Sequence, residues 1–182
     1  EIELVNGFNL KRLGVVLNTT YAVKNYPSSS SYFHALLTKN DITDISAMRE
    51  RFYKIIMFSS ILYELKRDYT IIEFEKNKYV SIARLESLGF DRTKLKQYCD
   101  KVYAYAQNID FFTIESLSKQ GFTADLESLG FEPWFYSSIL REDHRFSHRK
   151  MGGTVLFHAA GQEASIRNLV FSILEQESSV DV

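Results

Sequence analysis

The chain has 182 residues, of which 45% are hydrophobic and 25% charged, a composition typical of folded globular proteins. Its formal net charge of −1 excludes a strongly basic coat protein, so any contact with DNA must come from local basic patches. The single cysteine excludes an internal disulfide, and the sequence has neither a signal-peptide pattern nor 18 consecutive apolar residues. We therefore expect a cytoplasmic protein that makes no membrane contact.

The first 40 residues predict a helix followed by a short β-hairpin. We expect the helix at about residues 9–25 and the hairpin at about 30–38, after a run of turn-forming residues at 27–31.

The middle of the chain predicts two helices separated by a β-hairpin. Apolar residues at helical spacing predict a long amphipathic helix at about 46–66. Alternating segments at 69–75 and 78–81 predict a hairpin. A second helix is expected at about 92–107.

Residues 79–82 (YVSI) and 111–114 (FFTI) share a pattern of two apolar residues, a hydroxyl residue and isoleucine. In each copy the Ser or Thr would cap a two-turn helix that ends at a glycine, Gly89 or Gly121. This repeat indicates that a structural unit occurs more than once in the chain.

The last part of the chain predicts a helix at about 133–141 and then a hairpin. Residues 145–149 and 154–158 alternate well enough to form two strands around Gly152-Gly153. A final helix is expected at about 163–176, followed by the first strand of another unit at 180–182.

The order of helix, strand, short helix, longer helix and hairpin resembles the winged helix-turn-helix superfamily. The resemblance implies a mostly α (α+β) fold of tandem winged helix-turn-helix modules with small β-hairpin wings. We expect a partial module at residues 1–43, a degenerate middle module at 44–108, a module with a longer wing at 109–162 and a truncated one at 163–182. Because the chain would open and end inside modules, we expect it to be part of a longer protein.

In this superfamily the helix after the turn typically enters the major groove, and the wing contacts phosphates. The resemblance therefore implies that the helix at 9–25 and the wing near 145–150 contact nucleic acid. The candidate residues are Lys11, Arg12, Asn18, Thr19, Thr20, Lys24, Arg145, His148, Arg149 and Lys150. The alternatives are a solvated helix face and an ordinary basic hairpin. In the helix at 133–141, Trp134 and Phe135 are expected to pack in the core.

The sequence contains no recognisable catalytic or metal-binding pattern. His34 and His158 occupy matching places in two predicted wings, which indicates a repeated structural role. His144 and His148 are four residues apart, but no cysteine or carboxylate pattern completes a set of metal ligands. Cys99 is expected to be an inert core thiol. We therefore expect no enzyme, no cofactor and no metal.

These observations favour a nucleic-acid-binding or regulatory segment of a larger cytoplasmic, bacterial protein, whose winged modules contact DNA. The alternative is a protein-interaction adaptor built from the same modules, whose partner is a separate protein or another segment of the parent chain. In a third possibility, the modules only position an enzyme domain elsewhere in the parent protein.

Overall fold

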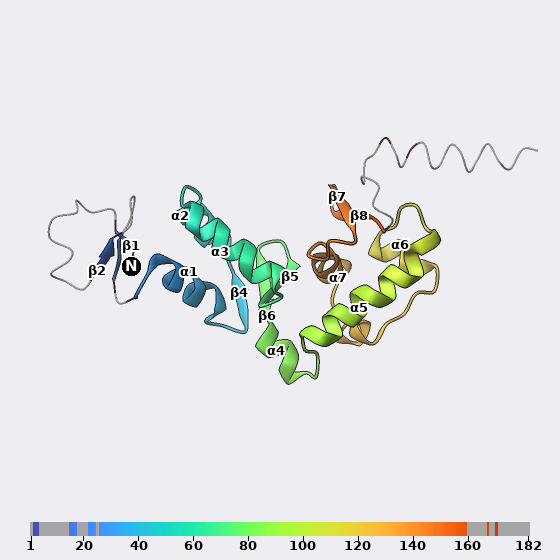
Figure 1. The fold of residues 1–182 in the computed structure, drawn as a ribbon, viewed down its shortest axis with the longest axis horizontal. Helices are drawn as coiled ribbons and strands as arrows, with labels where there is room; N and C mark the ends of the chain where they lie inside the picture. The colour runs from blue at the N-terminus through green and yellow to red at the C-terminus, as the bar shows by residue number, and fades with distance from the viewer. Residues whose placement is uncertain are drawn as a thin grey trace, which may run out of the picture.

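The computed structural model describes residues 2–3, 15–17, 22–24, 26–159, 167 and 170. These residues form an α+β fold in which helices surround small antiparallel sheets, and the helical units follow one another along an elongated body (Figure 1). In the described part of the chain, no helix has the length and apolarity needed to cross a membrane.

The first unit spans residues 29–81 and contains three helices and a three-stranded sheet. Its elements are α1 (Ser29–Thr38), β4 (Ile42–Asp44), α2 (Ser46–Phe52), α3 (Ile56–Arg67), β5 (Ile71–Glu75) and β6 (Lys78–Ser81). β6 lies in the centre of the sheet, because Val80 pairs with Ile42 of β4 on one side and with Ile72 of β5 on the other. The predicted hairpin at 69–81 is confirmed, whereas β4 was not predicted.

An aromatic cluster explains why the expected long helix at 46–66 is divided into α2 and α3. The Phe33 ring of α1 packs against both Phe52 and Phe58, at centroid distances of 5.3 and 5.5 Å. Six residues apart on one continuous helix, those two rings would point about 120° away from each other. The turn at residues 53–55 allows both rings to reach Phe33.

The second unit spans residues 92–158 and is reached through the short helix α4 (Ile82–Ser87). Its elements are α5 (Arg92–Tyr105), η2 (Ala106–Asn108), α6 (Ile114–Lys119), η3 (Asp125–Leu129), α7 (Pro133–Leu140), β7 (Ser147–Met151) and β8 (Thr154–His158). A single bridge joins Phe112, which precedes α6, to Phe157 of β8. The helices predicted at 92–107 and 133–141 and the hairpin at 145–158 are therefore confirmed.

The predicted helix caps are also confirmed. The Ser81 hydroxyl accepts a hydrogen bond from the Arg84 amide at 3.2 Å, at the start of α4. At the start of α6, the Thr113 hydroxyl accepts from the Ser116 amide at 3.1 Å, and the Ser116 hydroxyl accepts from the Thr113 amide at 2.9 Å. This reciprocal pair is a complete capping box.

The sheet of the first unit lies between two hydrophobic cores. Ile71 and Tyr79 pack into the first core with the helices α1 to α3. The alternate residues Ile72 and Val80 pack into the second core, where α7 lies against β5 (Figure 1). Because both faces of this sheet are covered, the two units are joined through a shared apolar interface.

Two predictions for the N-terminal region are wrong. Where a helix was expected at 9–25, the described residues form the strands β2 (Val15–Leu17) and β3 (Ala22–Lys24), and β3 lies between β2 and β1 (Ile2–Glu3). The β-branched residues Val15, Val16 and Val23 favour strands over helices.

The short wing expected at 30–38 is the helix α1. The Ser28 hydroxyl caps this helix by accepting from the Ser31 amide at 3.0 Å, and Phe33 and Leu37, four residues apart, place two fully buried side chains on one face. His34 therefore lies on an exposed helix surface and His158 in a buried strand, so they do not occupy matching places.

The two cores divide the chain at positions other than the expected module boundaries. The expected boundary between residues 43 and 44 falls inside β4, and the first core extends from Tyr32 to Tyr79. The boundary between 108 and 109 falls between α5 and α6, whose buried residues share the second core. Residues 167 and 170 are helical, as expected for 163–176, and the strand expected at 180–182 lies outside the described residues.

Candidate nucleic-acid interface

The helix α3 packs on the first core with one face and presents the opposite face to solvent. Its buried side chains, which are spaced three or four residues apart, are Phe58, Ile61, Leu62 and Leu65. The solvent-facing side chains are Ile56, Ser59, Ser60, Tyr63, Glu64 and Arg67. The exposed face therefore carries the hydroxyl groups of its two serines and of Tyr63 and a guanidinium, which can hydrogen-bond to bases or phosphates, beside one carboxylate and one apolar side chain.

Basic residues are concentrated around this face. Residues 46–67 contain five basic and two acidic residues, although the whole chain has a net charge of −1. The basic residues are Arg49, Arg51, Lys54, Lys66 and Arg67, of which Lys66 is paired with the Glu142 carboxylate at 3.5 Å. Two of them lie over neighbouring rings, with the Arg51 guanidinium 5.4 Å from the Phe52 centroid and the Lys54 ammonium 5.3 Å from that of Tyr53. This cluster is a local basic patch of the kind that a near-neutral DNA-binding protein needs.

Two surface hollows meet along the C-terminal half of α3. The first, of about 830 Å³, lies between α2 and α3 and is lined in part by Arg49 and Tyr53. The second, of about 970 Å³ with open solvent included, lies between α3 and the start of β7, and its lining includes His148 and the carboxylates of Glu142 and Asp143. Tyr63 and Lys66 line both hollows, so the α3 face continues onto the second unit.

The candidate residues of the hairpin have different environments. His148 lines the hollow beside α3, where partial burial and the positive charges of Arg141 and Lys66 lower its pKa below the ordinary value. Arg149 is exposed on β7. Lys150 is also exposed, but its ammonium lies 4.6 Å from the Trp134 ring centroid and lines a different cleft.

Arg145 is engaged within the protein. Its guanidinium lies 2.6 Å from Asp143 and 2.8 Å from Asp100, and it covers the Tyr103 ring at 5.0 Å. The Arg145 guanidinium donates hydrogen bonds to the Asp143 carboxylate, and these raise the pKa of Arg145, so the guanidinium keeps its positive charge at this position. We therefore assign Arg145 the structural role of anchoring the start of β7 to α5, and not the expected phosphate contact.

The remaining candidates belong to the N-terminal region. Lys24 is the last residue of β3. Lys11, Arg12, Asn18, Thr19 and Thr20 lie outside the described residues.

The helix α7 is covered by protein on most of its surface. Phe135, Ile139 and Leu140 are fully buried, and Phe135 stacks on Phe131 at 4.2 Å. Trp134 is half-buried, with the Arg141 guanidinium 5.3 Å from its ring centroid. The expected core packing of Trp134 and Phe135 is confirmed. Because β5 lies against α7, this helix does not have a free face like that of α3.

Comparisons with protein-family models, with curated proteins and with solved structures find no significant match to this chain. The candidate interface therefore stands on its geometry and charge.

The exposed face of α3 was missed by the sequence reasoning. The segment 46–66 was expected to be one long amphipathic helix, and no binding role was assigned to it. Two signals pointed to the face, namely the five basic residues within 46–67 and the Ser59-Ser60 pair that interrupts an apolar run.

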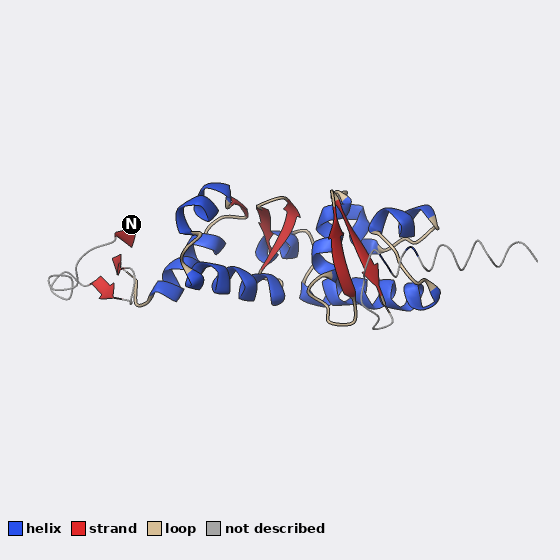
Figure 2. Ribbon diagram, turned by 90° about the horizontal axis from the view of Figure 1, so that it is seen from above, coloured by secondary structure: helices blue, strands red, loops and turns tan. Residues whose placement is uncertain are grey.

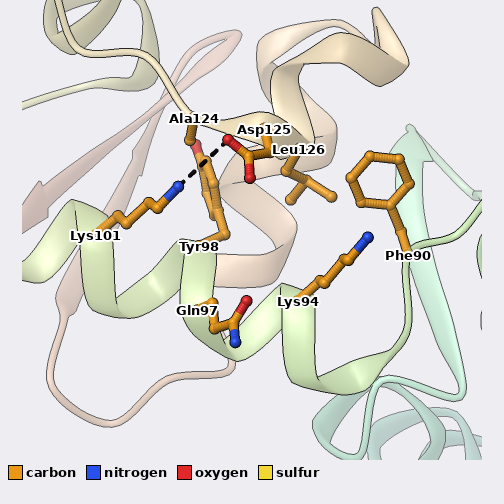
Figure 3. Close-up of a pocket in the computed structure, with 8 residues that line it drawn as sticks. All are labelled: Phe90, Lys94, Gln97, Tyr98, Lys101, Ala124, Asp125 and Leu126. Atoms are coloured by element: carbon orange, nitrogen blue, oxygen red, sulfur yellow. Dashed lines mark hydrogen bonds and ion pairs between the residues drawn. The ribbon is translucent and has the colours of Figure 1, made fainter.

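A small hollow between α5 and η3 offers no comparable surface (Figure 3). Its volume is only about 20 Å³, it lies beside Tyr98, and the Lys101 ammonium lies 3.4 Å from the Asp125 carboxylate at its edge. Because the hollow is small and the Lys101 charge is offset by Asp125, we assign this hollow no binding role.

The described residues contain no group of three or more His, Cys, Asp or Glu side chains that could hold a metal ion. Cys99 is fully buried, and this burial raises its pKa to about 12. Its thiol lies 3.9 Å from the Tyr69 hydroxyl, which donates a hydrogen bond to the Ile139 carbonyl at 3.1 Å. This polar contact belongs to the junction between the two units. A buried thiol whose pKa is raised is a poor nucleophile, so we assign Cys99 no reactive role.

Proposed function

We propose that residues 29–81 and 92–158 are two winged helix-turn-helix modules and that the first binds duplex DNA through α3. The order of elements supports this proposal, because each unit runs helix, strand or bridge, helix, helix and hairpin. In each unit the segment before the second helix also pairs with the last strand of the hairpin. These are features of the winged fold.

The observation that carries the proposal is the solvent-facing surface of α3, the helix that follows the turn in the first module, together with the basic residues of α2 and the turn before it. Ser59, Tyr63 and Arg67 lie on its exposed face and are placed to contact base edges and sugar-phosphate oxygens. Arg49 and Lys54 flank this face and would bind the adjacent phosphates.

The second module would serve as a support. Its α7 occupies the position of a recognition helix but packs against β5, so it would fix the orientation of the first module and not enter a groove. Arg149 on β7 extends the basic surface beyond α3, and the His148 imidazole beside it would serve as a hydrogen-bond donor to phosphates further along the duplex.

Salt-dependent binding to duplex DNA tests the proposal. With fluorescence anisotropy, we expect Lys54→Ala and Arg67→Ala each to weaken binding several-fold and to lower the salt slope by about 1, the effect of losing one phosphate contact. The matched control replaces two exposed lysines of the second module, Lys96→Ala with Lys119→Ala, and should change neither quantity. Equal effects in the test and control variants would contradict the proposal.

A second candidate function, protein binding, is favoured by one observation. Three large apolar side chains on or beside the α3 face are exposed, Tyr53 at 70%, Ile56 at 83% and Tyr63 at 58%. Exposed aromatic and apolar groups are typical of protein interfaces. Binding through this surface would depend on Ile56 and only weakly on salt, so the same salt titration separates the two functions.

A further inference from the structure

A cleft lies between the turns of the two hairpins. Seen from above, the hairpins β5–β6 and β7–β8 run side by side in the middle of the molecule (Figure 2). The cleft is open to solvent and has a volume of about 710 Å³. Its lining comes from residues 74–76 of the first turn, residues 130–134 leading into α7, and Lys150, Gly152 and Gly153 of the second turn.

Aromatic side chains form the walls of the cleft. Phe74, Phe131 and Trp134 line it, and each is half-buried. The Phe74 and Phe131 rings lie 5.7 Å apart, and Phe131 is itself stacked on the buried Phe135 at 4.2 Å. The rings are therefore held in position by the cores below them, and they suit a flat apolar ligand.

Charged groups stand at both hairpin turns. Lys76 and Lys150 both line the cleft, and the Lys150 ammonium lies over the Trp134 ring at 4.6 Å from its centroid. Two carboxylates also line it, but Glu75 is paired with Lys78 at 2.8 Å, which leaves the exposed Glu132 as the principal acidic group. The cleft thus offers cations for an anionic group and one carboxylate for an amino group.

We infer that this cleft binds a nucleotide unit, with its base against the aromatic walls and its phosphate at Lys76 or Lys150. A base is flat and would pack against the rings. Adenine, guanine and cytosine carry an exocyclic amino group that can donate a hydrogen bond to the Glu132 carboxylate. The phosphate is anionic and would pair with a lysine. Aromatic platforms flanked by lysines are the means by which proteins hold unpaired bases of single strands. The base would belong to a single strand if the proposed nucleic-acid function holds, and to a free nucleotide otherwise.

Trp134, the only tryptophan in the chain, reports on this cleft directly. We expect a short single-stranded oligodeoxyadenylate to quench Trp134 fluorescence. Lys76→Ala and Phe74→Leu should each weaken this binding, by about 5- to 150-fold for loss of a stacking wall, and Lys96→Ala should not. Circular dichroism of each variant checks that it is folded.

Adenosine monophosphate, titrated in parallel, separates the two sources of the nucleotide. Quenching by the oligonucleotide alone indicates a single strand, and equal quenching by the mononucleotide indicates a free nucleotide. The quench should survive Lys54→Ala and Arg67→Ala, so failure of duplex binding by α3 leaves it unaffected. The inference would be overturned if neither the oligonucleotide nor the mononucleotide quenched Trp134 fluorescence. It would also be overturned if neither Lys76→Ala nor Phe74→Leu weakened the quenching.

Discussion

Arg141 and Glu73 form a largely buried ion pair that joins the two units of the protein. The Arg141 guanidinium at the end of α7 lies 3.0 Å from the Glu73 carboxylate of β5, and the two side chains are 16% and 9% exposed. Glu73 also accepts a hydrogen bond from the Asn77 amide at 3.0 Å, and Arg141 donates to the Ser138 hydroxyl at 3.1 Å. The pair therefore links the hairpin of the first unit to the end of α7 in the second.

Breaking this pair should destabilise the whole fold. Arg141→Met leaves the Glu73 carboxylate buried without its cation, and we expect the free energy of unfolding to fall by about 3–5 kcal/mol. Adding Glu73→Gln, which keeps an acceptor for the Asn77 amide, should recover much of that loss. Urea denaturation followed by circular dichroism measures both variants, and equal stability of the wild type and Arg141→Met would refute the role of the pair.

The Cys99 thiol should be unreactive until the protein unfolds. Burial raises its pKa from 9.0 to about 12, so at pH 8 the thiolate is about 1000-fold scarcer than for an ordinary cysteine. We expect a disulfide reagent such as dithionitrobenzoate to modify the native protein very slowly and the urea-unfolded protein rapidly. Fast modification of the native protein would show that the junction between the units opens readily.

The glycine pair in the turn of the β7–β8 hairpin provides an internally controlled test of backbone strain. Gly152 has a φ of +60°, a left-handed conformation, whereas Gly153 does not, and an added Cβ would meet no atom within 4 Å at either position. We expect Gly152→Ala to destabilise the protein by about 1–2 kcal/mol and Gly153→Ala to have little effect. Thermal denaturation gives the comparison, and similar losses in both variants would contradict it.

Stability should decrease below pH 6.5 because of His148. Its pKa in the folded protein is lowered from 6.5 by partial burial and by the charges of Arg141 and Lys66, with Glu142 opposing them. As the pH falls from about 6.5 toward the lower pKa of the folded state, the unfolded chain binds a proton at His148 more readily than the folded one does. The free energy of unfolding therefore decreases. The contribution of His148 is intact above about pH 6.5 and is lost as the pH falls through the folded pKa.

Urea denaturation at pH 7.5 and pH 5.5 measures this effect. His148→Gln should lose less stability between the two pH values than the wild type does. An identical loss in both proteins would show that His148 is not the group responsible.

The sequence predicted those elements whose signals are local. The hydroxyl caps at Ser81 and Thr113, the alternation of the two hairpins and the helical spacing in α5 depend on residues within a few positions of each other. Each of these elements was found where it was expected.

The elements that were missed depend on contacts between distant residues. β4 has only three residues and exists because it pairs with β6, more than 30 positions away. The break between α2 and α3 is set by Phe33 of another helix. No local pattern encodes either relationship.

Dependence on contacts between distant residues also limited the prediction of the nucleic-acid interface. Arg145 has the sequence context of a basic hairpin, but the fold places it 2.8 Å from Asp100 of α5, which is 45 positions away. The α3 face was hidden because its exposure depends on which helices cover the first core. Whether a basic residue is available to DNA follows from the tertiary arrangement and not from its neighbours in sequence.

The most direct test of the account is a map of the DNA-contacting residues. In nuclear magnetic resonance spectra of the isotope-labelled chain, titration with a short duplex at low salt should shift the amide signals of residues 53–67 most strongly. Smaller shifts are expected at residues 144–150, and the buried residues 135–140 of α7 should change little. Strong shifts confined to α7, or to α5 and α6, would contradict the claim that α3 is the helix that meets DNA.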